Sequence, residues 1–420
     1  GEGCRGKLMG YCIADQPPMA SGKVRFCGEP VAAVVADSPE IAAEACLKIM
    51  VVYEDLPSVF DVRESMTPSA PLVHENIQNY KIVPFYKPVY NTNIYHSHTM
   101  QRGSIEHGFE LADRIFENDF TFPHISHCQL EPHCCLSWWK SDGSLHVWSS
   151  TQSPFMVRSI LAELFDMNFS GVNVTSPYIG GGFGGKADYT IEPLTAYIAS
   201  FVKGKPVKLL LEREEMFSGT LMGRGSHAIV KTGVKKDGTI TAWHTDIVIN
   251  AGAYGNYCIN IIMGAARSSC GVYSIPNIRI DAKSVYTNLP INGAYRAYGH
   301  PEGHWGAERQ MDIIAREMNF DPVNFRLQNI LKPGDVYITG IEIEEENGNL
   351  RECIQKTAEA MGFNSSTQKP NETNSETKAQ TSKDRFVRGK GIAAFVKTPA
   401  MAVNKPSSAR ITFNEDCSAS

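Results

Sequence analysis

The 420-residue sequence predicts an α+β fold with roughly two or three domains. Two observations lead to this prediction. Hydrophobic residues make up 42% of the chain, which suits a buried core and excludes a disordered protein. A strand–helix–strand pattern occurs near the start of the chain. Farther along the sequence, pairs of strands are joined by short turns, and helices are predicted between these pairs.

The first unit is predicted from residues 23–53. Residues 23–37 alternate and then become continuously apolar, which indicates a partly buried strand. Ser38 and Pro39 follow as the cap and the first residue of a short helix, and residues 51–53 read as another strand. This pattern predicts a small α/β unit that ends near residue 72.

The later elements follow from apolar periodicity and turn residues. We expect helices that start at residue 154, lie around 194–201 and span 301–318. Strands are expected at residues 114–122, 136–148 (a hairpin that turns at 141–144), 172–175, 207–211, 229–234, 239–250, 280–287, 389–396 and 409–414. The last of these would enter a turn at Glu415 and Asp416.

Charge and cysteine content narrow the class of protein. The net charge of −5 gives no reason to expect a nucleic-acid or membrane partner, and no apolar run approaches the ~18 residues of a spanning helix. The eleven cysteines are scattered and odd in number, which favours free thiols in the cytoplasm. Their spacing does not predict an iron–sulfur cluster in this chain.

The most informative stretch is the glycine-rich segment of residues 175–189, TSPYIGGGFGGKADY. So many glycines cost backbone entropy, so they indicate a sharp turn that comes close to another group. The match to G-x-G-x-x-G is weak, because no acidic residue follows at the required distance. The match to a phosphate-binding loop fails at Ala187, which has no hydroxyl for magnesium.

A cluster of possible metal ligands lies at residues 124–135, where three histidines, one glutamate and three cysteines occur together. Its spacing fits no zinc template. We therefore interpret it as a core segment with buried thiols rather than as a metal site.

Five stretches in one order carry a family resemblance: residues 24–37 (VRFCGEPVAAVVAD), 147–153 (VWSSTQS), 175–189, 275–279 (IPNIR) and 287–303 (TNLPINGAYRAYGHPEG). With them the chain resembles the xanthine dehydrogenase and aldehyde oxidase family of molybdenum hydroxylases. The resemblance covers about residues 23–334. It implies that an electron-poor carbon is hydroxylated with oxygen from water, and that electrons leave through 2Fe-2S and FAD centres located elsewhere.

The resemblance also implies roles for particular residues. Contacts to a molybdenum–molybdopterin cofactor, whose pterin holds the metal without protein ligands, are expected from Gln152, Gly182, Phe183, Gly184 and Arg296. Contacts to the substrate are expected from Tyr298 and from the position of Ala187.

This chain departs from the family pattern at three places. The catalytic glutamate of the family lies beyond Ser420, so no catalytic residue is expected here and the chain alone should be inactive. Xanthine dehydrogenases have a glutamate at the position of Ala187 and an arginine at that of Gly264, with Arg267 the nearest arginine in this sequence. These losses disfavour a purine substrate and leave pyridines such as nicotinate, other heteroaromatics and aldehydes open.

The resemblance implies the following domain division. Residues 1–80 would be part of the small α/β (hammerhead) domain, 81–95 a linker, 96–335 the first molybdopterin-binding domain, 336–388 a connection with a flexible polar stretch at 364–384, and 389–420 the start of a second molybdopterin-binding domain. Because the chain stops just after a predicted strand, we expect a split subunit, as in nicotinate dehydrogenase-type enzymes.

A split subunit implies specific partners. A second molybdopterin-binding subunit, an iron–sulfur subunit and a FAD subunit are expected, with such sets assembled as dimers. The alternative is a noncatalytic or assembly relative that has the same fold and no cofactor.

Overall fold

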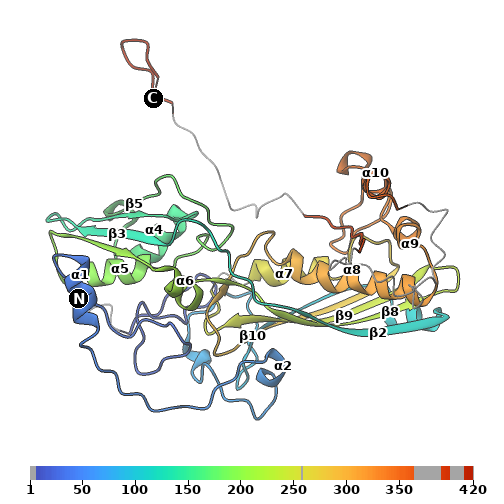
Figure 1. Ribbon diagram of the computed structural model, residues 1–420, viewed down its shortest axis with the longest axis horizontal. Helices are drawn as coiled ribbons and strands as arrows, with labels where there is room; N and C mark the ends of the chain where they lie inside the picture. The colour runs from blue at the N-terminus through green and yellow to red at the C-terminus, as the bar shows by residue number, and fades with distance from the viewer. Residues whose placement is uncertain (1–5, 257–258, 364–388, 398–410, 420) are drawn as a thin grey trace, which may run out of the picture.

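The computed structural model describes residues 6–256, 259–363, 389–397 and 411–419. Its largest sheet has the strand order β1 (Ile94–Arg102), β10 (Asn277–Tyr286), β9 (Ile240–Gly252), β8 (Ser226–Val234) and β2 (Arg114–Phe122). Within this sheet only the pair β9–β10 is parallel, and helix α7 (Ile259–Ser268) connects its two strands. Helix α8 (His300–Glu317) lies beside α7 on the same face of this sheet (Figure 1).

The main core lies between this sheet and its two helices. Trp243 and Ile280 of the sheet pack in one cluster with Ile262 of α7 and Met311 of α8, and each of these side chains is at most 1% exposed. Helices α9 (Pro322–Asn329) and α10 (Leu350–Ala360) extend the cluster. The apolar residues that recur every three or four positions in α8 therefore mark its buried face.

A second sheet has the order β5 (Val172–Thr175), β4 (Leu145–Ser149), β3 (Cys134–Trp139) and β6 (Pro206–Leu210). Helices α4 (Pro154–Leu164) and α5 (Glu192–Ala199) pack on this sheet. The second core lies between the helices and the sheet and includes Leu145 of β4 and Leu161 of α4. Short elements complete the fold: α2 (Val62–Ser65), α3 (Ile105–Glu110), α6 (Arg213–Gly219), β7 (Met222–Gly223), β11 (Asn292–Gly293), and 3-10 turns at Ile77–Asn79, Phe169–Gly171 and Glu345–Asn347.

The structure confirms the α+β class and most of the predicted elements. The predicted hairpin at 136–148 is β3 and β4, and the helix predicted from residue 154 is α4, with Pro154 in its first turn. The helix predicted after Ser38 is α1 (Pro39–Cys46), where the Ser38 side chain accepts a hydrogen bond from the Ile41 amide. Among the described helices, none is long and apolar enough to cross a membrane.

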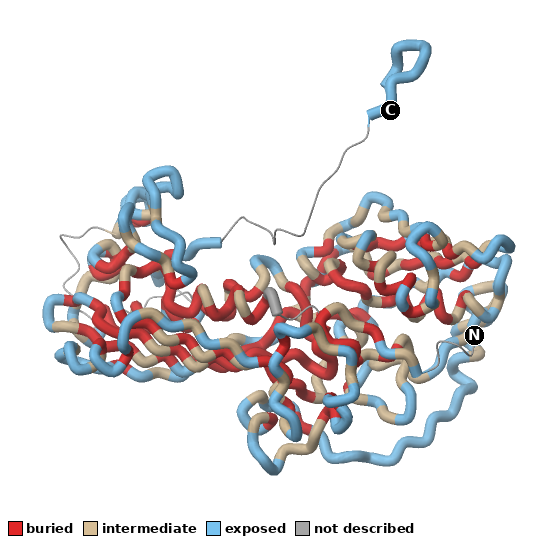
Figure 2. The backbone as a smooth tube through the Cα atoms, turned by 180° about the vertical axis from the view of Figure 1, so that it is seen from behind, coloured by how far each residue is buried: buried red, intermediate tan, exposed pale blue. Residues whose placement is uncertain are grey.

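The two strands predicted at residues 23–37 and 51–53 are wrong, because neither segment forms a ladder. A strand needs a neighbour for its backbone groups, and no described segment forms a ladder with these residues. The bridge of Ser21 with Lys23 and the hydrogen bond from Ala20 N to Pro30 O (2.8 Å) are isolated contacts. Val52 is 93% exposed, and the chain between α1 and α2 runs along the outside of the molecule (Figure 2).

The strand predicted at 389–396 is wrong as well. This segment joins no sheet, and side chains of α8 bond two of its backbone groups: Ala394 N donates to Glu308 Oε2 (2.9 Å), and His304 Nε2 donates to Val396 O (3.1 Å). Of the strand predicted at 409–414, the described part forms one bridge, Phe413 with Ala419, around the predicted turn. The polar stretch 364–384 lies outside the described residues.

Candidate functional site

Two turns that are far apart in the sequence meet at the candidate site. The glycine loop (residues 180–187) leads from β5 toward α5, and the second turn (residues 293–299) leads from β11 into α8. A Cβ atom at Gly184 would lie 2.5 Å from the carbonyl oxygen of Ala294, so the two backbones are in direct contact. The guanidinium carbon of Arg296 lies 5.9 Å from the centre of the Phe183 ring, which is a cation–π distance.

Gln152 joins the end of β4 to this site. Its backbone N–H donates to Lys186 O (2.7 Å), and its side-chain Oε1 accepts from Gly184 N (3.0 Å). Because Oε1 is the acceptor, the amide Nε2 is the atom left to donate, and among the described residues it has no partner. A Cβ at Gly182 would lie 2.3 Å from Oε1, so this contact requires glycine there.

Phe183 projects from the loop in an uncommon conformation. Its φ of +54° lies in the left-handed region, and its side chain is 48% exposed. The backbone N–H groups of Gly182 and Phe183 have no acceptor within the described part of the chain. Together with Gln152 Nε2, they are three of the donors that have no partner among the described residues and are available to an oxygen-rich ligand.

The second turn contains Tyr298 and the first residues of α8. Ala297, Tyr298 and Gly299 are consecutive left-handed residues, and Tyr298 N donates to Tyr295 O (2.6 Å). Non-glycine residues adopt this conformation at a cost, which functional turns often bear. A Cβ at Gly264 of α7 would lie 2.5 Å from Tyr298 O, so no larger residue fits at position 264 without a backbone shift.

Ala187 is the last residue of the glycine loop. Its N–H donates to Gly184 O (3.0 Å), and its methyl group is half-buried. The position thus offers no charge or hydrogen bond from its side chain. Arg267, the arginine nearest in sequence to Gly264, lies in the last turn of α7, where its Nε donates to Met263 O (3.0 Å).

Glu131 is a residue of this site that the sequence did not reveal. Its Oε2 accepts from Gly180 N (2.8 Å) and from Lys186 Nζ (2.5 Å), at opposite ends of the glycine loop. Burial alone would raise the pKa of the Glu131 carboxyl, but the hydrogen bonds from Lys186 and Gly180 outweigh it and lower that pKa. The Lys186 side chain is fully buried, so it cannot face a phosphate, and the phosphate-loop reading fails.

Two histidines of the 124–135 cluster support the same loops. His133 Nε2 donates to Gly185 O (3.1 Å), and His127 Nε2 donates to Ala294 O (2.7 Å). Burial lowers the pKa of His133 to about 4 and also lowers that of His127, so both rings are neutral near pH 7. Within the described ranges, no group of three or more Cys, His, Asp or Glu side chains could hold a metal ion. No sequence signal distinguishes these scaffold residues, because their partners lie far away along the chain.

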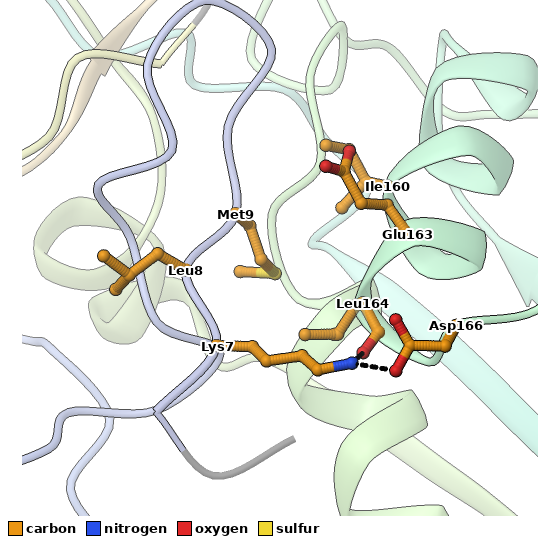
Figure 3. A pocket seen from close by; sticks show the side chains of 7 residues that line it. All are labelled: Lys7, Leu8, Met9, Ile160, Glu163, Leu164 and Asp166. Atoms are coloured by element: carbon orange, nitrogen blue, oxygen red, sulfur yellow. Dashed lines mark hydrogen bonds and ion pairs between the residues drawn. The ribbon is translucent and has the colours of Figure 1, made fainter. Parts of the chain in front are cut away.

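A separate cavity of about 240 Å³ lies between the N-terminal segment and the C-terminal end of α4 (Figure 3). Met9, Ile160 and Leu164 give it an apolar wall, and Lys7 reaches across it to Asp166. Gln152 lies just before the N-terminal end of α4, whereas the cavity lies at its C-terminal end. The two ends are about 16 Å apart for a helix of this length. The cavity is therefore not part of the site.

Comparison with known proteins identifies the family. Residues 86–330 match the molybdopterin cofactor-binding domain, and residues 5–57 match the a/b hammerhead domain of aldehyde oxidase and xanthine dehydrogenase. The chain therefore belongs to the molybdenum hydroxylase family of molybdenum-dependent oxidoreductases.

Individual relatives agree with this assignment. The chain is 31% identical to the nicotinate dehydrogenase large molybdopterin subunit of Eubacterium barkeri over 84% of this chain and 80% of the relative. It is also 31% identical to the xanthine dehydrogenase molybdenum-binding subunit of Escherichia coli O157:H7, over 89% of this chain and 46% of that protein. The aldehyde oxidoreductase of Desulfovibrio gigas superposes with a TM-score of 0.73 at 26% identity, over 83% of this chain and 37% of that one. The chain thus spans less than half of the latter two proteins.

The geometry fits a molybdopterin cofactor. Such a group brings its own sulfur ligands, so it needs hydrogen-bond donors and backbone access from the protein rather than carboxylate or thiolate ligands. The three unpaired donors of Gln152, Gly182 and Phe183 meet that need, and Arg296 adds a positive charge beside them.

Proposed function

We propose that this chain is the molybdopterin-binding subunit of an enzyme that hydroxylates an electron-poor carbon with oxygen from water. The observation that supports the proposal most is Gln152, whose Oε1 is occupied by Gly184 N while Nε2 remains available beside the glycine loop. When bound, the molybdenum–pterin group would activate water and supply the two-electron redox chemistry.

The residues of this chain would bind and orient that group. Gln152 Nε2 and the amides of Gly182 and Phe183 would donate hydrogen bonds to its oxygen atoms, and Arg296 would balance its negative charge. Gly184 keeps the two turns close enough for both to reach one ligand. The base that takes the proton from water would come from another segment or chain.

For the substrate, we propose a pyridine such as nicotinate over a purine. A purine presents polar edges that need partners in a closed pocket. Ala187 supplies only a methyl group, and at Gly264 the carbonyl of Tyr298 occupies the space where a side chain would begin. The similarity to the nicotinate dehydrogenase subunit, of which the chain spans 80%, also favours a pyridine. Tyr298 would pack against the ring.

The proposal includes the domain division and the partners stated from the sequence. Residues 96–335 would form the first molybdopterin-binding domain, and residues 389–420 would begin the second. A second molybdopterin-binding subunit would complete the site, an iron–sulfur and a FAD subunit would carry electrons away, and such sets would assemble as dimers in the cytoplasm.

The test is to purify the chain together with its co-expressed neighbouring subunits and to measure molybdenum and pterin. We expect one of each per chain, and reduction of a dye by nicotinate in preference to xanthine and aldehydes. A folded complex without molybdenum would refute the proposed function and favour a noncatalytic relative. A loaded complex that prefers xanthine would refute only the substrate class.

A further inference from the structure

The glycine loop is closed by one carboxylate. Glu131 exchanges two hydrogen bonds with Gly180, since Glu131 N donates to Gly180 O (3.2 Å) and Gly180 N donates to Glu131 Oε2 (2.8 Å). The same Oε2 also accepts from Lys186 Nζ at 2.5 Å. The start and the end of the loop are therefore joined through a single side chain.

The Lys186 end of this contact is fully buried. The Lys186 side chain is 0% exposed, and Glu131 is 32% exposed. A buried ammonium group needs a partner, because removing its counter-charge leaves the whole desolvation cost uncompensated. The pair is thus unlike the surface pair of Lys356 and Glu352, whose side chains are 74% and 50% exposed and which should matter little.

Other contacts fix the interior of the loop. Gly185 N donates to Gly182 O (2.8 Å), and the carbonyl of Lys186 accepts from Gln152 N (2.7 Å). With both ends and the interior bonded, Phe183 is held in its left-handed conformation. The amides of Gly182 and Phe183 are among the described amides of this loop that have no acceptor.

We propose that Glu131 and Lys186 are positioning residues that hold the glycine loop in its ligand-binding curvature before any cofactor arrives. This inference rests on the proposed function for the identity of the ligand, whereas the preformed curvature is a property of this chain. Neither residue needs to touch the cofactor. Glu131 sets the distance between the loop ends, and Lys186 fixes the orientation of Glu131.

The experiment measures hydrogen exchange in the peptide covering residues 178–188 of the full, cofactor-free chain. Variants are Glu131→Ala, Glu131→Gln and the double variant Glu131→Gln with Lys186→Met, and Glu352→Gln is the matched control. In Glu131→Ala the loop amides should exchange at least about tenfold faster than in wild type, while peptides of α8 stay unchanged. Glu131→Gln should show a smaller acceleration, because the amide oxygen still accepts from Gly180 N.

Rescue separates positioning from general stability. The double variant removes the unpaired charge, so its loop should exchange more slowly than that of Glu131→Gln alone. Molybdenum content of the co-expressed complex should follow the same order as loop protection. Wild-type exchange in Glu131→Ala, or equal acceleration in the loop and in α8, would overturn the inference. Wild-type complex without molybdenum would overturn the proposed function while leaving the loop result intact.

Discussion

Replacing Gly184 with alanine tests whether the contact between the two turns builds the site. Gly184 has a φ of +103°, and an added Cβ would lie 2.5 Å from Ala294 O and 2.8 Å from its carbonyl carbon. The backbone conformation costs a non-glycine residue about 1–2 kcal/mol. The steric conflict adds about 1–3 kcal/mol, because its partner is backbone rather than a movable side chain.

Gly204 provides a matched control. Its φ of +87° is similar, yet an added Cβ there meets no atom within 4 Å. Gly204→Ala should therefore show only the conformational cost, whereas Gly184→Ala should show about 2–5 kcal/mol in total. If the glycine loop moves away from Ala294 instead, part of this cost disappears and cofactor binding falls.

The assay combines urea unfolding of both variants with the molybdenum content of the co-expressed complex. We expect Gly184→Ala to lose more unfolding free energy than Gly204→Ala, or to lose most of its molybdenum, and Gly204→Ala to be fully loaded. The reasoning is refuted if Gly184→Ala is as stable as Gly204→Ala and equally loaded with molybdenum.

Three further outcomes are expected. Gln152→Ala should lower kcat about tenfold or more by removing one donor, with a change of at most about 1.5 kcal/mol in unfolding free energy; unchanged turnover would remove Gln152 from the site. Ala187→Glu should lower kcat/KM for nicotinate more than for neutral nicotinamide, because like charges repel, whereas Ala187→Gln should not discriminate. Burial raises the pKa of Glu302 to about 7, so the folded state keeps a proton that the unfolded state has lost, and stability falls as pH rises from about 4.5 to 7. The free energy of unfolding of Glu302→Gln should thus be close to that of wild type at pH 5 and exceed it by about 1–3 kcal/mol at pH 8. Equal unfolding free energies at pH 8 would contradict this.

Some parts of the site follow from local sequence alone. The glycines at residues 180–185 predict a sharp turn, and Gln152 stands between a strand end and Pro154, where the structure has the end of β4 and the start of α4. These signals are local, since turn residues and helix caps act within a few positions. They place Gln152 and Phe183 at element ends but say nothing about their partners.

Other parts could not be predicted locally. The apolar pattern at residues 23–37 resembles a strand, but pairing requires a neighbour that no local pattern supplies. The histidines at 127 and 133 and Glu131 read as a core segment, and their contacts with the two turns come from residues far along the chain.

The sequence by itself determined the fold class, most helices and strands, and the family to which the chain belongs. Only the tertiary structure decided which polar groups are paired: Lys186 is buried against Glu131, whereas Gln152 Nε2 and the amide of Phe183 have no partner in the part of the chain that the structure describes. The physical reason is that turns and caps depend on neighbouring residues, whereas burial and hydrogen-bond pairing depend on segments that meet only after folding.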